Sequence, residues 1–341
     1  MNRRGFGMKR SGAFLAARGL PMRTLKRAVR SRCGATVFLP MLIMAVLPGH
    51  ANATEGGGTS KPLGQNTVMS GVMPPPGSLR STTTFAYYDA NDTLDGNGEP
   101  RAGISNFHAT MQTATLRFQY VWSDVEVFNA NLATSVGIAA YVHATRESDV
   151  KTPAGTSHRQ GSASGIGDLR LTPVSLGWHA DRVHQIAGFD IFLPTANYNP
   201  EQLVNVGRGN YTIAPAYWIT WFPIDEVEAD LNIFYLYNFE NPNTNYRGGN
   251  EISTDYALGY AITPMWQAGI SGYAYKQVTD DQLNGKDVPG GNKGQVLGIG
   301  PYVRYHPSKD WGITLKWLTE TMVENRSQGN RFLLQFALKL W

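Results

Sequence analysis

The residue types that most often perform chemistry are scattered along this sequence. Outside the first 53 residues there are six histidines, His108, His143, His158, His179, His184 and His306. None belongs to an H-E-x-x-H motif or to another spacing typical of a metal site, and no G-x-S-x-G motif marks an activated serine. We therefore expect no catalytic residue, no metal ligand and no cofactor-binding residue.

Two local patterns come closest to a reactive site. His179 and His184 flank a short turn with Ser175 nearby, which leaves open a lipid hydrolase built from a serine and a histidine on adjacent strands. Asp280 and Asp281 could bind a divalent cation through carboxylate oxygens, although such a pair is more often a solvated turn. Both patterns are weak, and an enzyme is not expected.

The first 53 residues predict a secretory signal. Residues 1–33 contain ten lysines and arginines and no acidic residue, an apolar segment follows at 35–47, and A-N-A at 51–53 is a typical cleavage site. We expect cleavage after Ala53, and the sequence leaves open whether Met1 or Met22 is the start. The alternative, a retained membrane anchor, fits less well because the apolar run is shorter than about 18 residues and is broken by proline.

The chain that remains after this cleavage is mildly acidic and contains no cysteine. Residues 54–341 contain 20 basic and 26 acidic residues, and the single cysteine, Cys33, lies in the signal. This charge does not predict a nucleic-acid partner. Without a thiol, disulfides and thiolate metal sites are excluded in the exported chain.

The elements that must position any functional side chain are β-strands. The segment 227–233, V-E-A-D-L-N-I, alternates apolar and polar residues without a slip, and 116–122, 256–262, 297–305 and 332–340 follow the same rule. A period of two over about ten residues is the strand pattern. The sequence therefore predicts an all-β protein.

Twelve strands are predicted, and long and short connections alternate between them. The strands lie near 79–90, 108–122, 131–145, 165–179, 183–195, 211–222, 227–239, 250–263, 266–279, 294–307, 311–324 and 329–341. The long connections are 91–107, 146–164, 196–210, 240–249 and 280–293, and the short ones are 123–130, 180–182, 223–226, 264–265 and 308–310. The final hairpin at 325–328 is the exception to this alternation.

An even strand count with short turns at one end and long loops at the other is typical of a transmembrane barrel. We therefore predict an antiparallel up-and-down β-barrel of the bacterial outer-membrane type over 79–341, with both chain ends on the periplasmic, short-turn side. Its expected partners are membrane lipids, the outer-membrane assembly machinery and a small solute. Aromatic residues near strand ends fit the two interfaces: Trp122, Trp221, Trp266, Trp317 and Trp341. The alternative is a soluble periplasmic β-protein, whose apolar face would point inward.

On the membrane interpretation, charged residues on the polar side of each strand face the lumen. These candidates are Arg117, Asp168, Arg170, Asp190, Glu228, Asp230, Arg304, Lys316 and Arg331, with Lys339 in the last strand. They could form a salt-bridged interior that holds the barrel in shape, a polar conduit, or both.

Residues 54–78 precede the first strand without periodicity and are either a flexible periplasmic tail or a plug that folds into the barrel.

Several ordered motifs resemble one protein family. They are M-P-P-P-G at 73–77, G-I-G-D at 165–168, G-F-D-I-F-L-P-T at 188–195, N-V-G-R-G-N-Y at 205–211, N-T-N-Y-R-G-G-N-E at 243–251, Q-V-T-D-D at 277–281, G-P-Y at 300–302 and E-N-R-S-Q-G at 324–329. Together they resemble the outer-membrane proteins named after the meta-cleavage pathway of phenol degradation. That resemblance implies an outer-membrane location and the passage of small, often aromatic or apolar, molecules.

The expected function is facilitated diffusion of such molecules through the barrel. A structural or adhesive barrel with a plugged lumen is the first alternative, and a lipid hydrolase on the barrel wall is the second. The sequence leaves the solute, the gating and the oligomeric state open.

Overall fold

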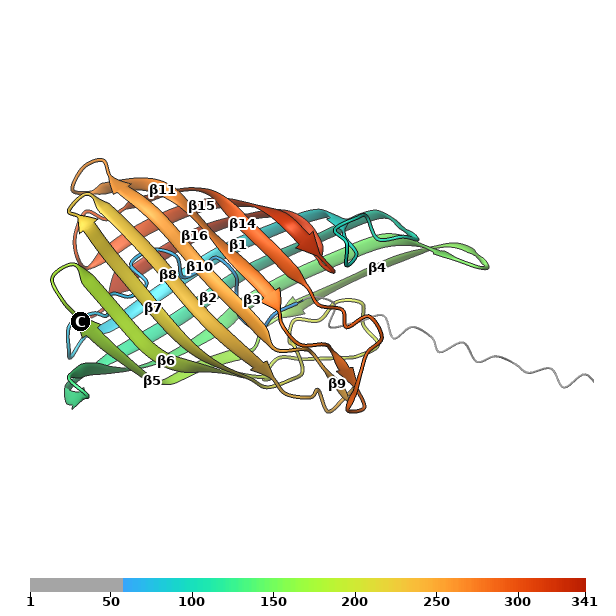
Figure 1. Ribbon diagram of the computed structural model, residues 1–341, viewed down its shortest axis with the longest axis horizontal. Coiled ribbons are helices and arrows are strands. Elements are labelled where there is room, and N and C mark those ends of the chain that lie inside the picture. The colour runs from blue at the N-terminus through green and yellow to red at the C-terminus, as the bar shows by residue number, and fades with distance from the viewer. Residues whose placement is uncertain (1–57) are drawn as a thin grey trace, which may run out of the picture. The chain divides into compact units, whose positions relative to one another are not determined.

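The alternating strands form one antiparallel sheet that closes on itself (Figure 1). The structure is a computed structural model that describes residues 58–341, so the predicted signal at 1–53 lies outside the described residues. No helix in the described part of the chain is long and apolar enough to cross a membrane. The first strand pairs with both the second and the last, which closes the barrel.

Twelve strand positions make up the wall, which confirms the predicted number. The strands are β1 (Leu79–Thr93), β2 (Ile104–Val127), β3 (Ala130–Thr152), β4 (Gly155–Gly165), β5 (Leu169–His179), β6 (Val183–Leu193), β7 (Thr212–Ile224), β8 (Val227–Asn238), β10 (Glu251–Ala261), β11 (Trp266–Gln277), β14 (Gln295–Tyr305), β15 (Trp311–Glu324) and β16 (Ser327–Lys339). Both β4 and β5 pair with β3, one after the other, and therefore share one position. Closure leaves no unpaired strand edge in the wall, which hydrocarbon requires.

The connections follow the predicted asymmetry with one correction. Residues 146–164, predicted as a loop, belong to a long hairpin in which β3 and β4 pair from Val142–Gly165 out to Thr152–Gly155. This hairpin has no apolar face, so apolar alternation could not reveal it even though its backbone is fully paired. Among the other long connections, β9 (Tyr246–Arg247), β12 (Gln282–Leu283) and β13 (Lys286–Asp287) form a small sheet of their own.

The two faces of the wall are the reverse of those of a soluble protein. On β8, the side chains of Leu231 and Ile233 point outward and are 40% and 43% exposed. The side chains of Asp230 and Asn232 point inward and are 4% and 0% exposed. Tryptophans with large exposed surfaces gather near the short-turn end, at Trp122, Trp221, Trp266, Trp311 and Trp341. An apolar outer band with an aromatic girdle is the pattern of a barrel that spans a membrane.

Glycines on the inner wall make room for tyrosine side chains. A Cβ at Gly298 would lie 2.4 Å from the Tyr273 ring, and one at Gly259 would lie 2.0 Å from the Tyr302 hydroxyl. These glycines therefore relieve crowding, and the space they leave is filled.

The segment before β1 runs through the inside of the barrel. At the end with the long connections, Arg208 Nη2 donates to the carbonyl of Gly58 at 2.9 Å. At the short-turn end, the amide of Gly77 donates to the carbonyl of Val121 at 2.8 Å. Gly58 therefore lies at the end opposite to the C-terminus, because inward carboxylates and hydroxyls bind this segment along its length. The predicted N-terminal end of the processed chain, residue 54, lies outside the described residues.

Candidate functional site

The upper part of the segment, residues 58–66 toward the end with the long connections, is held by a buried ion pair. Lys61 Nζ lies 2.7 Å from Asp255 Oδ1 on β10, and both side chains are fully buried. The same carboxylate accepts hydrogen bonds from the amides of Gly64 at 3.0 Å and Asn66 at 3.2 Å. From β15, Lys316 Nζ donates to the carbonyls of Gly64 and Gln65, both at 3.1 Å. Two strands of the wall, β10 and β15, which are separated by β11 and β14, therefore hold the same short stretch of backbone.

The lower part of the segment, around residues 69–71 toward the short-turn end, is bound by β7 and β8. Glu228 accepts the amide of Met69 at 2.9 Å, and Asp230 accepts the amide of Ser70 at 3.0 Å. The amide of Gly71 donates to Thr220 Oγ1 at 2.9 Å. Since peptide amides are satisfied here by side chains of the wall, the segment needs no secondary structure of its own.

Two other predicted inward charges, Arg170 and Arg331, pair with carboxylates on the inner face of the wall. Arg170 Nη2 lies 2.5 Å from Asp190 Oδ2, and Asp190 is fully buried. Arg331 Nη2 lies 3.9 Å from Glu320, and its guanidinium lies 4.8 Å from the Tyr88 ring centre. The sequence left two interpretations open, a salt-bridged interior and a polar conduit. These contacts are those of a salt-bridged interior.

Asp168 occupies a different place from the other predicted residues. It lies in the break between β4 and β5, where its carboxylate accepts the amides of Ala196 at 3.0 Å and Arg208 at 2.8 Å. It therefore anchors the long connection between β6 and β7.

Sequence reasoning missed the residues that hold the segment most firmly. Asp255 lies on the polar phase of β10, so the same alternation that selected Glu228 could have selected it. Lys61 lies in a stretch without periodicity, and nothing in its sequence context pointed to a buried partner 194 positions away.

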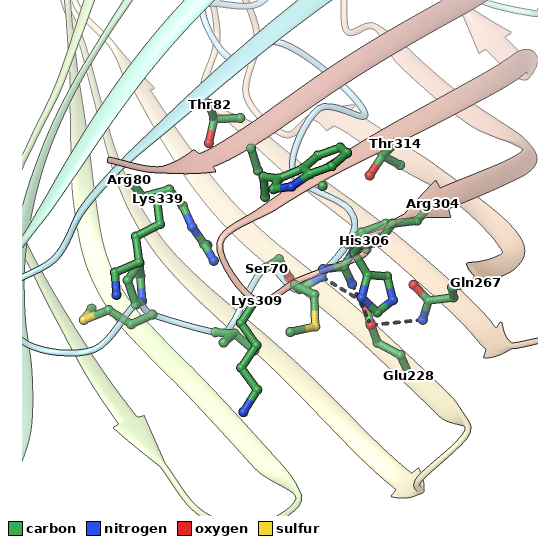
Figure 2. A pocket seen from close by; sticks show the side chains of 18 of the residues that line it. Ser70, Arg80, Thr82, Glu228, Gln267, Arg304, His306, Lys309, Thr314 and Lys339 are labelled. Atoms are coloured by element: carbon green, nitrogen blue, oxygen red, sulfur yellow. Dashed lines mark hydrogen bonds and ion pairs between the residues drawn. The ribbon is translucent and has the colours of Figure 1, made fainter. Parts of the chain in front are cut away.

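A cavity of about 870 Å³ remains inside the barrel at the short-turn end, beside the lower part of the segment (Figure 2). One side is apolar and includes Val72, Ile186 and Trp218. The other side is basic: Arg80, Arg117, Arg304 and Lys339 line it. A cavity of this size falls in the range of about 300–1,000 Å³ typical of small-molecule sites.

His306 also lines this cavity, in the turn between β14 and β15. Burial, together with the nearby charge of Arg304, lowers the pKa of its imidazole below the usual value of 6.5. The imidazole is therefore neutral at pH 7 and adds no charge to the basic side.

The two patterns considered for chemistry serve structural contacts. Ser175 Oγ donates to the carbonyl of Ala133 at 3.1 Å, while His179 and His184 face each other with their Nδ1 atoms 3.1 Å apart. Asp280 pairs with Lys293 at 2.8 Å. Asp281 accepts the amide of Gly249 and the side-chain amide of Gln277, both at 2.8 Å. Among residues 58–341, no three His, Cys, Asp or Glu side chains gather as a metal-binding group.

Comparison with protein families identifies the family of this barrel. The family described as "Putative MetA-pathway of phenol degradation" matches residues 90–336. The chain belongs to this family. The match begins within β1 and ends within β16, so it spans all twelve strand positions of this member of the phenol-degradation family. The resemblance predicted from the ordered motifs is thereby confirmed.

Comparison with solved structures finds a similar fold in a bacterial outer membrane channel. The COG4313 outer membrane channel from Pseudomonas putida F1 aligns at a TM-score of 0.62 with 15% identity, over 79% of this chain and 97% of that one. A Pseudomonas aeruginosa FadL homologue aligns at 0.36 with 10% identity, over 84% and 96%. The NanC porin aligns at 0.39 with 10% identity, over 76% and 100%. No curated protein matches the sequence. The likeness to the first of these structures confirms the fold class, an outer-membrane type of β-barrel.

Proposed function

We propose that this protein is an outer-membrane channel that lets small apolar or aromatic solutes diffuse across the membrane, and that residues 58–78 gate it. The observation that carries the proposal is the way the lumen is filled. The segment crosses the whole interior on hydrogen bonds and one ion pair, is joined covalently to the wall only where it continues into β1, and leaves a cavity with an apolar side at the short-turn end. A solute that displaces part of the segment gains a path into that cavity.

Two comparisons support this proposal. The family description refers to phenol degradation, which suggests an aromatic solute. A protein of similar fold is described as an outer membrane channel. Fold alone does not determine the solute, so the aromatic class rests on the family and on the apolar side of the cavity.

The first alternative is a structural or adhesive barrel whose lumen stays closed. The observation that favours it is the strength of the upper contacts, because the pair of Lys61 and Asp255 is fully buried and further bonded. Such a barrel would have no need for its interior to open.

Uptake by whole cells separates the channel from the structural barrel. The probes are radiolabelled naphthalene, as an apolar aromatic, and sucrose, as a hydrophilic solute. We expect cells that express the full chain to take up naphthalene several-fold faster than cells with an empty vector, with no change for sucrose. A variant that lacks residues 59–76 should admit both. If neither the full chain nor this variant raises the uptake of either probe, the structural barrel is the better account.

A further inference from the structure

The cavity at the short-turn end carries more positive charge than its carboxylates can balance. Its strand wall contributes the cations Arg80, Arg117, Arg304 and Lys339 but a single carboxylate, Glu228. Glu228 is already shared, because it accepts the amide of Met69 and the side chain of Gln267 and lies 3.5 Å from Arg304. The remaining charged lining residues, Asp225, Glu226, Lys309 and Asp310, are exposed in turns at the rim, where water and salt screen them.

Arg80 is the most unusual member of this group. Among residues 58–341 its side chain has neither an ion-pair partner nor a hydrogen-bond acceptor. It lies directly opposite Lys339 on β16, and Figure 2 shows these two side chains next to each other. Like charges directly opposite each other on paired strands are destabilising. The barrel therefore tolerates a local cost that a bound anion would remove.

Arg117 extends the basic side onto β2. Gln119 lies opposite Arg80, and Arg117 is two residues further along the same face, at the diagonal position that long side chains can reach. Arg117 donates only to the hydroxyl of Ser135, at 3.2 Å through Nε and 3.0 Å through Nη2. No carboxylate forms an ion pair with it among the described residues. Two guanidinium groups without a carboxylate partner thus face one cavity.

The opposite side of the same cavity is suited to an apolar group. Ile186 and Trp218 line it and belong to a buried apolar cluster that also contains Met73 of the segment. A ligand for the whole cavity must therefore be negative at one end and apolar at the other. Guanidinium groups bind carboxylates through parallel hydrogen bonds, which makes a carboxylate the natural head group.

We propose that this cavity binds a small amphipathic carboxylate, with its head group between Arg80 and Arg117 and its apolar body against Ile186 and Trp218. The inference rests on the proposed function and adds the charge class of the solute. At the short-turn end such a site receives the solute after it passes the segment. Conduction requires that binding at this site be weak enough for release.

The test compares three probes with the same fluorinated ring and different charge. The probes 4-fluorobenzoate, 4-fluorobenzyl alcohol and 4-fluorobenzylamine are titrated against the purified full chain in detergent, and ¹⁹F line broadening gives each dissociation constant. We expect the carboxylate to bind about tenfold more tightly than the alcohol, since a charge-assisted hydrogen bond contributes roughly that much. The amine should bind more weakly than the alcohol.

Two variants assign the preference to the proposed site. The double change Arg80→Gln and Arg117→Gln should abolish the preference for the carboxylate, while Arg159→Gln on the exposed β3–β4 hairpin, which also removes an arginine charge, should leave it unchanged. An unboiled gel sample checks that each variant is a folded barrel. Equal affinity for all three probes, or a preference that survives the double change, would overturn the inference. Normal naphthalene uptake alongside such a result would leave the proposed function standing, whereas failed uptake with intact binding would remove only the transport role.

Discussion

At the scale of single residues, alternation predicts candidate inward side chains but not what they bind. Period-two alternation placed Glu228 and Asp230 on the lumen side, and the structure finds both there. Their partners, the amides of Met69 and Ser70, come from a stretch without periodicity. Pattern analysis has no access to such contacts, because a backbone amide is present in every residue except proline.

The carboxylate of Asp255 should hold the upper part of the segment in place. Asp255→Ala leaves the ammonium group of Lys61 buried without its partner, a change that typically costs about 3–5 kcal/mol. We expect amide hydrogen exchange in residues 59–71 to accelerate by at least about a hundredfold, since 1.4 kcal/mol corresponds to a factor of ten. Peptide-level exchange measured by mass spectrometry reports this directly.

Asp280→Ala provides the control for that measurement. Asp280 pairs with Lys293 at the surface, where both side chains are well exposed, and such pairs contribute only about 0–1 kcal/mol. Exchange in residues 59–71 should not respond to this change. Equal protection in both variants would show that the buried pair does not hold the segment.

At the scale of elements, alternation predicted strand number and faces better than strand ends. All twelve strands were found, and most boundaries agree within three residues. The exceptions are both ends of β2, the start of β5 and the β3–β4 hairpin. In that hairpin, S-H-R-Q at 157–160 and its partner strand are polar on both faces. Apolar alternation ends where the lipid ends, whereas backbone pairing continues into water.

The outer face of β8 provides a test of lipid contact. Ile233 lies in the middle of the strand and is exposed, and Ile262 lies just past the end of β10. In phospholipid vesicles, we expect Ile233→Lys to lower the free energy of unfolding by about 2–4 kcal/mol. Ile262→Lys should lower it by only about 0–1 kcal/mol, because the cost of a lysine depends on its depth in the bilayer.

A soluble barrel would respond differently to the same pair of variants. Exposed surface substitutions usually change stability by about 0.5 kcal/mol or less, so both lysines would then have the same small effect. Guanidinium titration of the reconstituted barrels distinguishes the two cases.

At the scale of the whole molecule, the path of residues 58–78 is the feature that local patterns could not predict. The sequence allowed either a tail or a plug, because a stretch rich in glycine and proline fits both. Its course through the barrel depends on side chains from four strands, β7, β8, β10 and β15, that are far apart in the sequence. The closed wall brings them together, so the contacts exist only once the barrel has formed.

A reversible lock on this segment tests the central claim most directly. Ser60 Oγ and Thr212 Oγ1 lie 3.0 Å apart, and residues 54–341 contain no other cysteine, so Ser60→Cys with Thr212→Cys would tie the segment to β7 alone. The measurement is naphthalene uptake by cells that express this double variant, before and after reduction. We predict uptake at the empty-vector level when oxidised and at the wild-type level when reduced, with each single cysteine variant unaffected by the redox change. Equal uptake in the oxidised and reduced states would contradict the account.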